Sequence, residues 1–163
     1  MSKRGQVAAV CISPNFNVPK YYQDWVMVGQ YGFIGDIHSG STRISRRTGQ
    51  PKFNDRQVSI CAQEVYKELN EELGLTLASG DFGENITTLG LGDLSDVTPG
   101  AWLIIPNKSI AFEVTEQNDP CVNLQKYHKL IVRKTYGRRG LLAIVRMGAG
   151  LLLFPGEPIQ IIS

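Results

Sequence analysis

One cysteine of this chain is preceded by residues that are typical of a helix start. The order is Asn118, Asp119, Pro120, Cys121. Asn and Asp favour turns and helix N-caps, and proline fits the first helical position because its missing N–H costs nothing there. The order predicts that Cys121 lies in the first turn of a short helix. There, free backbone N–H groups and the helix dipole favour a thiolate. The alternative is an incidental surface thiol.

A glycine-rich turn, "GDIHSG" at residues 35–40, carries a second set of reactive groups. Asp36 and His38 are two residues apart and share a face if the turn is extended. Their spacing is compatible with a mixed metal site that includes Cys121. A three-histidine zinc site is excluded, because the chain has only two histidines. The structural alternative is that Asp36 and His38 hold the loop in place by hydrogen bonds.

Another glycine-rich turn, "GDFGEN" at residues 80–85, contains Glu84, a candidate acid or base, although turns often carry carboxylates for structural reasons. Two familiar catalytic or binding motifs are excluded. The glycines at 148–150 lack the strand-to-helix context of a dinucleotide site, and no GxSxG nucleophile motif occurs.

The other two cysteines have sequence contexts that indicate packing. Cys11 lies in an apolar segment, and Cys61 begins an amphipathic one. Three widely separated cysteines form neither a disulfide framework nor a CxxC metal motif. We therefore expect a reducing, cytoplasmic compartment. No apolar run has the length of a membrane helix, so we expect no membrane partner.

Charge is distributed unevenly, although the formal net charge is only +2. Residues 120–156 contain no acidic residue, and neither does the segment between Asp36 and Asp55. The second of these segments carries Arg43, Arg46, Arg47 and Lys52. Such asymmetry indicates either a face that meets an anion or a solvated basic surface. We expect no nucleic acid partner, because the basic stretches lack interleaved aromatic residues.

The pattern along the chain predicts one mainly β domain over residues 1–163 with one or a few short helices. The clearest helix covers residues 61–74 and ends at Gly74. A long functional or disordered loop is expected at 38–55, because no apolar period occurs there. Strands are expected at 6–12, at 24–36 with a bend, at 57–60, and near the C-terminus at 158–163. Two hairpins are expected, one over 101–117 and one over 140–154.

Four motifs in a fixed order, "GDIHSG", "NDRQVSI", "GDFGENIT" and "DPCVNL", resemble the MOSC domain. This family is named after the C-terminal domain of molybdenum cofactor sulfurases, and its fold is a strand-rich, barrel-like domain. The resemblance spans nearly the whole chain. There are departures, since relatives tend to have Gly-Asp where this chain has Gly156 and Glu157.

The resemblance implies a function for the cysteine of the "PC" motif, here Cys121, which would carry a persulfide or ligate the molybdenum of molybdopterin. It also implies which residues surround the thiol. They are Gly35, Asp36, His38 and Gly40 of the first motif, Arg56 of the second, and Gly83, Glu84, Asn85 and Thr87 of the third. The phosphate of the cofactor would suit basic residues such as Arg56, Arg138 and Arg139.

Three functions follow from this resemblance and these residues. The first is a molybdenum-cofactor-binding protein that uses Cys121 to reduce N-hydroxylated compounds, with electrons from a separate donor protein and protons from Asp36, His38 or Glu84. The second is a persulfide carrier that takes sulfur from a donor protein and performs no catalysis. The third is a metal-dependent hydrolase. A complete cofactor sulfurase is not expected, because the large pyridoxal-phosphate domain is absent from the sequence.

Overall fold

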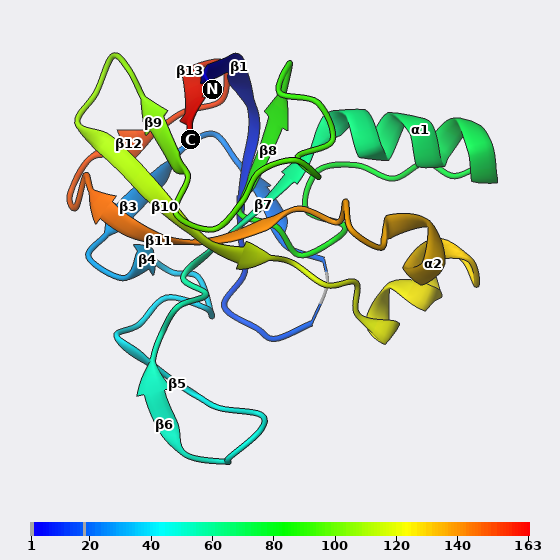
Figure 1. Cartoon of the computed structure of the whole chain (residues 1–163), viewed down its shortest axis with the longest axis horizontal. Coiled ribbons are helices and arrows are strands. Elements are labelled where there is room, and N and C mark those ends of the chain that lie inside the picture. Colours follow the sequence, from blue (N-terminus) through cyan, green and yellow to red (C-terminus); the bar gives the residue numbers. More distant parts are fainter. Residues whose placement is uncertain (1, 18) are drawn as a thin grey trace.

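Seven strands close into a β-barrel in the computed structural model, which describes residues 2–17 and 19–163 (Figure 1). The strand order is β13-β9-β10-β11-β7-β8-β1, and pairing of β1 with β13 closes the barrel. Only β7 and β8 pair in parallel among the described strands. The strands are β1 (Ser2–Ile12), β7 (Val58–Ala62), β8 (Ile86–Leu89), β9 (Trp102–Ile105), β10 (Ile110–Gln117), β11 (Leu141–Met147) and β13 (Pro158–Ile162). The mainly β, barrel-like fold expected from the sequence is confirmed.

The barrel interior is filled by apolar side chains from alternating strand positions. In β10, Ile110, Phe112 and Val114 are buried, as the alternation in the sequence predicts. The Phe112 ring packs edge-on against Phe33, with ring centroids 6.0 Å apart. Cys11 and Cys61 are also buried, which confirms their packing role.

A small second sheet covers part of the barrel. It contains β12 (Leu152–Leu153), β3 (Val26–Gly29) and β4 (Gly32–Phe33), in that order. The expected bend at 24–36 is confirmed as the turn between β3 and β4. The expected hairpin over 140–154 is wrong, because β12 pairs with β3 and not with β11. A further short strand, β2 (Tyr21–Gln23), extends the main sheet beside β1.

Two α-helices and one 3-10 helix lie on one side of the barrel. Helix α1 (Gln63–Leu73) buries Val65, Tyr66 and Leu69 and ends at Gly74, whose φ of 66° gives the left-handed C-cap that favours glycine. The 3-10 helix η1 (Val122–Lys126) and α2 (Ile131–Thr135) follow β10. No helix in residues 2–17 and 19–163 is long and apolar enough to span a bilayer.

The stretch expected to be an irregular loop at 38–55 contains a two-stranded hairpin instead, formed by β5 (Thr42–Ile44) and β6 (Pro51–Phe53). We call residues 42–53 the basic arm. It projects from the barrel, as Figure 1 shows at the bottom of the view. Cross-strand pairing of Arg43 with Lys52 puts these two side chains on one face. The arm has no core of its own, which explains the missing apolar period.

Candidate functional site

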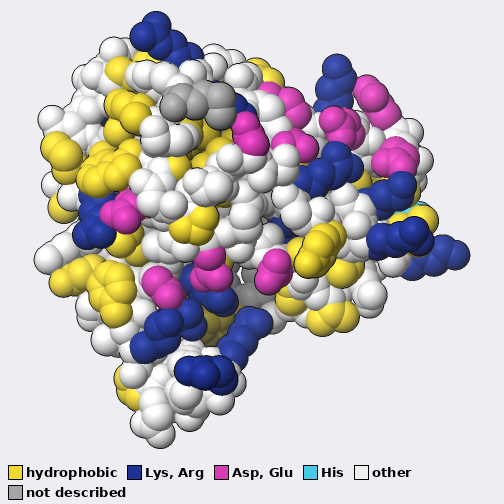
Figure 2. Space-filling model, in the orientation of Figure 1, with side chains coloured by type: hydrophobic (Ala, Val, Ile, Leu, Met, Phe, Trp, Pro, Cys, Tyr) yellow, Lys and Arg dark blue, Asp and Glu magenta, His cyan; other side chains and the backbone are white. Residues whose placement is uncertain are grey.

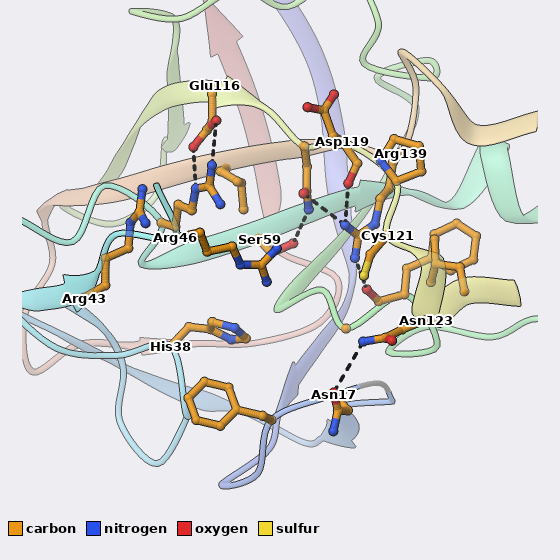
Figure 3. Close-up of a pocket in the computed structure, with 18 of the residues that line it drawn as sticks. Asn17, His38, Arg43, Arg46, Ser59, Glu116, Asp119, Cys121, Asn123 and Arg139 are labelled. Carbon is orange, nitrogen blue, oxygen red and sulfur yellow. Dashed lines mark hydrogen bonds and ion pairs between the residues drawn. The ribbon is translucent and has the colours of Figure 1, made fainter. Parts of the chain in front are cut away.

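A cavity of about 780 Å³ lies between the barrel, η1 and the basic arm (Figure 3). Cys121 lines it, together with five other residues that the sequence placed around the thiol: His38, Arg56, Gly83, Asn85 and Arg139. This volume is in the range of small-molecule sites. The remaining residues that the resemblance assigned to the pocket do not line it. They are Gly35, Asp36, Gly40, Glu84, Thr87 and Arg138.

The turn that carries Cys121 continues the sheet before the chain enters η1. The Asn118 N–H donates to the Gly140 carbonyl at 2.9 Å, which extends the pairing of β10 with β11. Cys121 is the N-cap of η1, with extended φ and ψ of −100° and 146°, and Leu124 N–H donates to its carbonyl. The expected placement of Pro120 at the first helical position is therefore wrong, because the helix begins at Val122.

Arg139 fixes this turn against the neighbouring loop. Its Nη1 donates to Asn118 Oδ1 at 3.1 Å and to the Asp119 carbonyl at 2.7 Å, while Nη2 donates to the Phe82 carbonyl at 2.9 Å. The acceptors include no carboxylate, and Nε is buried with no partner among the described residues. Figure 3 shows Arg139 next to Cys121. The thiol thus lies near a cation that pairs with no carboxylate of residues 2–17 and 19–163. The Asn118 amide is engaged by Arg139 rather than free to cap a helix.

His38 enters the cavity from the "GDIHSG" turn (Figure 3). Its Nδ1 lies 3.6 Å from Asp36 Oδ2, and its backbone N–H donates to the same oxygen at 3.1 Å. The Asn54 side chain donates to the carbonyls of His38 and Gly40 from the other side. The turn therefore holds one imidazole in the cavity, while Asp36 lies behind it.

Asp36 forms a buried ion pair with Lys20, at 2.8 Å, in which the two side chains are 0% and 1% exposed. Burial opposes ionisation of Asp36, but the hydrogen bond with His38 and the charge of Lys20 outweigh it and lower its pKa to about 2. Burial also disfavours the charged form of Lys20 and so lowers its pKa, and Asp36 partly offsets this effect. Asp36 thus acts on the cavity only through His38 and the loop that it holds, as the structural alternative for the motif predicts. Lys20 itself lines the cavity.

Glu84 is fully buried beneath the cavity wall. It accepts hydrogen bonds from Gly80 N–H at 2.8 Å, from the Thr87 hydroxyl at 2.9 Å and from the Tyr66 hydroxyl at 2.7 Å. Burial raises the pKa of Glu84. These contacts account for both Glu84 and Thr87 as supports of the turn at 80–85. The adjacent Asn85 bonds the backbone of two strands, through Ser59 N–H and the Cys11 carbonyl.

Of the three arginines expected near the cofactor phosphate, two line the cavity and one points away from it. Arg56 lines the cavity and forms a bidentate ion pair with Glu116, at 2.6 and 3.2 Å. Arg138 turns away, pairing with Glu68 of α1 and donating to the Lys134 carbonyl. Arg139 alone contacts the cysteine turn.

Several cavity residues were missed as site residues by reasoning from the sequence. Lys20 lies in a segment without a motif, and Phe16 and Asn123 had no signal. Arg46 and Arg47 were noted only as members of a segment without acidic residues. That lack of acidic residues was the sequence signal from which their place at the site could have been predicted. Seven cationic side chains line the cavity against two carboxylates, Glu116 and Asp119. The cations are Lys20, Arg43, Arg46, Arg47, Lys52, Arg56 and Arg139.

The mixed metal site of Asp36, His38 and Cys121 is not assembled. Within the described part of the chain, no group of three or more His, Cys, Asp and Glu residues is placed to hold a metal ion. Asp36 is instead committed to Lys20 and to backbone N–H groups. The ligand set on which the hydrolase hypothesis depended is thus missing from the cavity.

Comparison with known families agrees with this arrangement. The model of the MOSC domain matches residues 35–152, which include the histidine turn, the basic arm and the cysteine turn. The chain belongs to the MOSC domain family. No curated protein matches this MOSC protein in sequence.

Solved structures show the same fold over the full chain. The YuaD protein from Bacillus subtilis has a TM-score of 0.83 and 25% sequence identity, over 99% of this chain and 97% of that one. YiiM from Geobacillus stearothermophilus has a TM-score of 0.71 and 19% identity, over 98% and 75% of the two chains. YiiM from Escherichia coli has a TM-score of 0.62 and 20% identity, over 97% and 70%.

Proposed function

We propose that this MOSC protein binds molybdenum cofactor through Cys121 and reduces N-hydroxylated compounds with electrons from a separate donor protein. The observation that carries the proposal is the placement of Cys121. It is a partly exposed thiol at the wall of a cavity of ligand size, next to a cation with no carboxylate partner. Among the described residues, the other two thiols are buried.

The lining of the cavity fits this cofactor. Cys121 offers a soft sulfur ligand for the metal. Ser59, Asn118 and Asn123 offer amide and hydroxyl groups for a pterin ring, and Arg56 and Arg139 offer cations for its phosphate. Arg139 is suited to this because its hydrogen-bond acceptors among the described residues include no carboxylate. When bound, the cofactor supplies the two-electron redox chemistry that the reduction needs.

The protein itself must deliver protons. Reduction of R–NH–OH to R–NH₂ and water consumes two electrons, from the donor protein, and two protons. His38 is the histidine among the residues that line the cavity, and we assign it the role of passing a proton to the departing hydroxyl. Asp36 is a positioning residue, since it contacts His38 from behind. Glu84 is too deeply buried to contact a substrate.

The test compares the protein with its Cys121→Ser variant, both expressed in a host that makes the cofactor. Molybdenum is measured by elemental analysis and pterin by fluorescence of its oxidised form. Gln125→Ser changes an exposed position of η1 that does not line the cavity and serves as the matched control. We expect near-stoichiometric molybdenum and pterin in the wild type and the control, and loss of molybdenum in Cys121→Ser.

Molybdenum in none of the three proteins would contradict the proposal. In that case sulfane sulfur on Cys121, absent from the serine variant, would favour the alternative of a persulfide carrier. Both functions need an accessible thiol, so the metal content is the property that separates them.

A further inference from the structure

The cavity side of the basic arm carries cationic groups that the protein itself does not neutralise. Arg43 and Lys52 share one carboxylate, Asp55, at 2.6 and 2.9 Å. Arg46 and Arg47 lie in the hairpin turn, and their side chains have no hydrogen bond or ion pair with any described residue. All four cations line the cavity. Figure 2 shows Lys and Arg side chains gathered on the arm beside the hollow in the surface.

The opposite face of the arm has a different character. Ile44 and Phe53 are 60% and 53% exposed and alternate along the strands with Arg43 and Lys52. The arm thus presents its charge to the cavity and apolar groups to the outside. A large acidic partner docking on the outer face would not meet the cations. An anion that contacts all four cations lies at the cavity that they line, and the volume of about 780 Å³ fits a small molecule.

This cationic group is separate from the one at the cysteine. Nη1 and Nη2 of Arg139 donate to Asn118 and to two backbone carbonyls, and the guanidinium of Arg56 is paired with Glu116. If the phosphate of the cofactor binds at the cysteine end of the cavity, Arg46 and Arg47 are still available for a second phosphate. Arginine guanidinium groups bind phosphate oxygens bidentately, and two adjacent arginines without a partner offer two such groups.

An aromatic side chain stands at the same cavity. Phe16 is 69% exposed, lines the cavity and contacts the His38 ring edge-on, with centroids 6.0 Å apart. An exposed aromatic ring at a polar cavity is a surface on which a planar heterocycle can stack. Asn123 and Asn17 are hydrogen-bonded to each other beside it, at 3.4 Å.

We propose that the basic arm binds the phosphate of the substrate, and that the substrate is a phosphorylated heterocycle of the nucleoside monophosphate class. Arg46 and Arg47 hold the phosphate, Phe16 contacts the ring, and the ring lies toward His38 and Cys121. The claim that the protein reduces this ligand rests on the function proposed above. The claim that the arm binds a phosphate is independent of that function, so each claim can be contradicted without the other.

The test is calorimetric titration of the purified full-length protein with adenosine monophosphate and with adenosine. The variant is Arg46→Ala/Arg47→Ala. The control is Lys129→Ala/Arg133→Ala, which removes two exposed cations outside the cavity. We expect the wild type and the control to bind the monophosphate more tightly than adenosine, and the arm variant to lose about 10- to 100-fold in affinity for the monophosphate only. Arg46→Lys/Arg47→Lys should lose less, because it keeps the charge.

Molybdenum and pterin contents of the same proteins distinguish the two possible sources of the phosphate. Unchanged contents in the arm variant, with weakened monophosphate binding, support a substrate site. Loss of pterin from the arm variant would assign the arm to the cofactor and overturn the proposal. Equal binding of the monophosphate by wild type and arm variant would overturn it as well. All binding measurements remain informative if the protein holds no molybdenum.

Discussion

The barrel side and the arm side of the cavity both carry charged groups, but they satisfy them in opposite ways. On the barrel side, Lys20 and Asp36 form an ion pair almost completely removed from water, and Glu84 accepts three hydrogen bonds. On the arm side, Arg46 and Arg47 are exposed and have no partner among the described residues. The difference indicates that the barrel side serves to position the cavity walls, whereas the arm side keeps its charge available for a ligand.

The strongest way to break this comparison is to remove a partner of the buried ion pair. Lys20→Met leaves the Asp36 carboxylate buried without its cation, and we expect the free energy of unfolding to fall by about 3–5 kcal/mol. Arg46→Met on the arm should change it by less than about 0.5 kcal/mol, because the residue is exposed and unpaired. Urea unfolding followed by circular dichroism measures both. Equal effects at the two positions would contradict the distinction.

A pH titration of stability sharpens the comparison for Asp36. Its pKa in the folded protein is about 2, below the ordinary value of 3.8, so its ionised form stabilises the fold above about pH 4. This contribution is lost as the pH falls through 4 toward 2. It amounts to about 2 kcal/mol. The stability difference between wild type and Asp36→Asn should shrink by this amount between pH 6 and pH 2, and a constant difference would show that Asp36 titrates normally.

A smaller effect on stability than at Asp36 is expected for the carboxylate of the arm. Asp55→Asn removes the carboxylate shared by Arg43 and Lys52, and because these ion pairs remain partly open to solvent we expect a loss below about 1 kcal/mol. The same change frees two cations in the cavity, so affinity for adenosine monophosphate should rise by about threefold or more. Urea unfolding and calorimetric titration measure the two effects. A drop in affinity would mean that Asp55 orients the arm rather than competing with the ligand.

Much of the fold could be predicted because it follows local patterns. The helix ending at Gly74 and the strands of the 101–117 hairpin were visible as apolar periodicity and as turn residues. The pairing of β12 with β3 could not be predicted, since these strands are more than 120 residues apart and the glycines at 148–150 also suit a local turn. The basic arm was missed for a related reason, because a hairpin without a core has no apolar period.

The candidate site was predicted in part. Cys121 and His38 could be named from their motifs, and both line the cavity. Asp36 and Glu84 have the residue types of acids and bases, but only the structure shows that Lys20 and Tyr66 engage them. Contacts between residues that are far apart in the sequence cannot be predicted from local patterns. Conversely, the excess of basic residues in the arm was visible as composition, while its direction toward the cavity depends on the register of β5 with β6.

The closure of the barrel has a practical consequence for attaching other proteins to this one. Because β1 pairs with β13, Ser2 lies opposite Ile162, and both chain ends emerge side by side, far from the basic arm (Figure 1). A domain or surface tether joined to either end would leave the cavity mouth open. A fused electron donor would therefore need a linker long enough to pass around the barrel before it could reach the neighbourhood of Cys121.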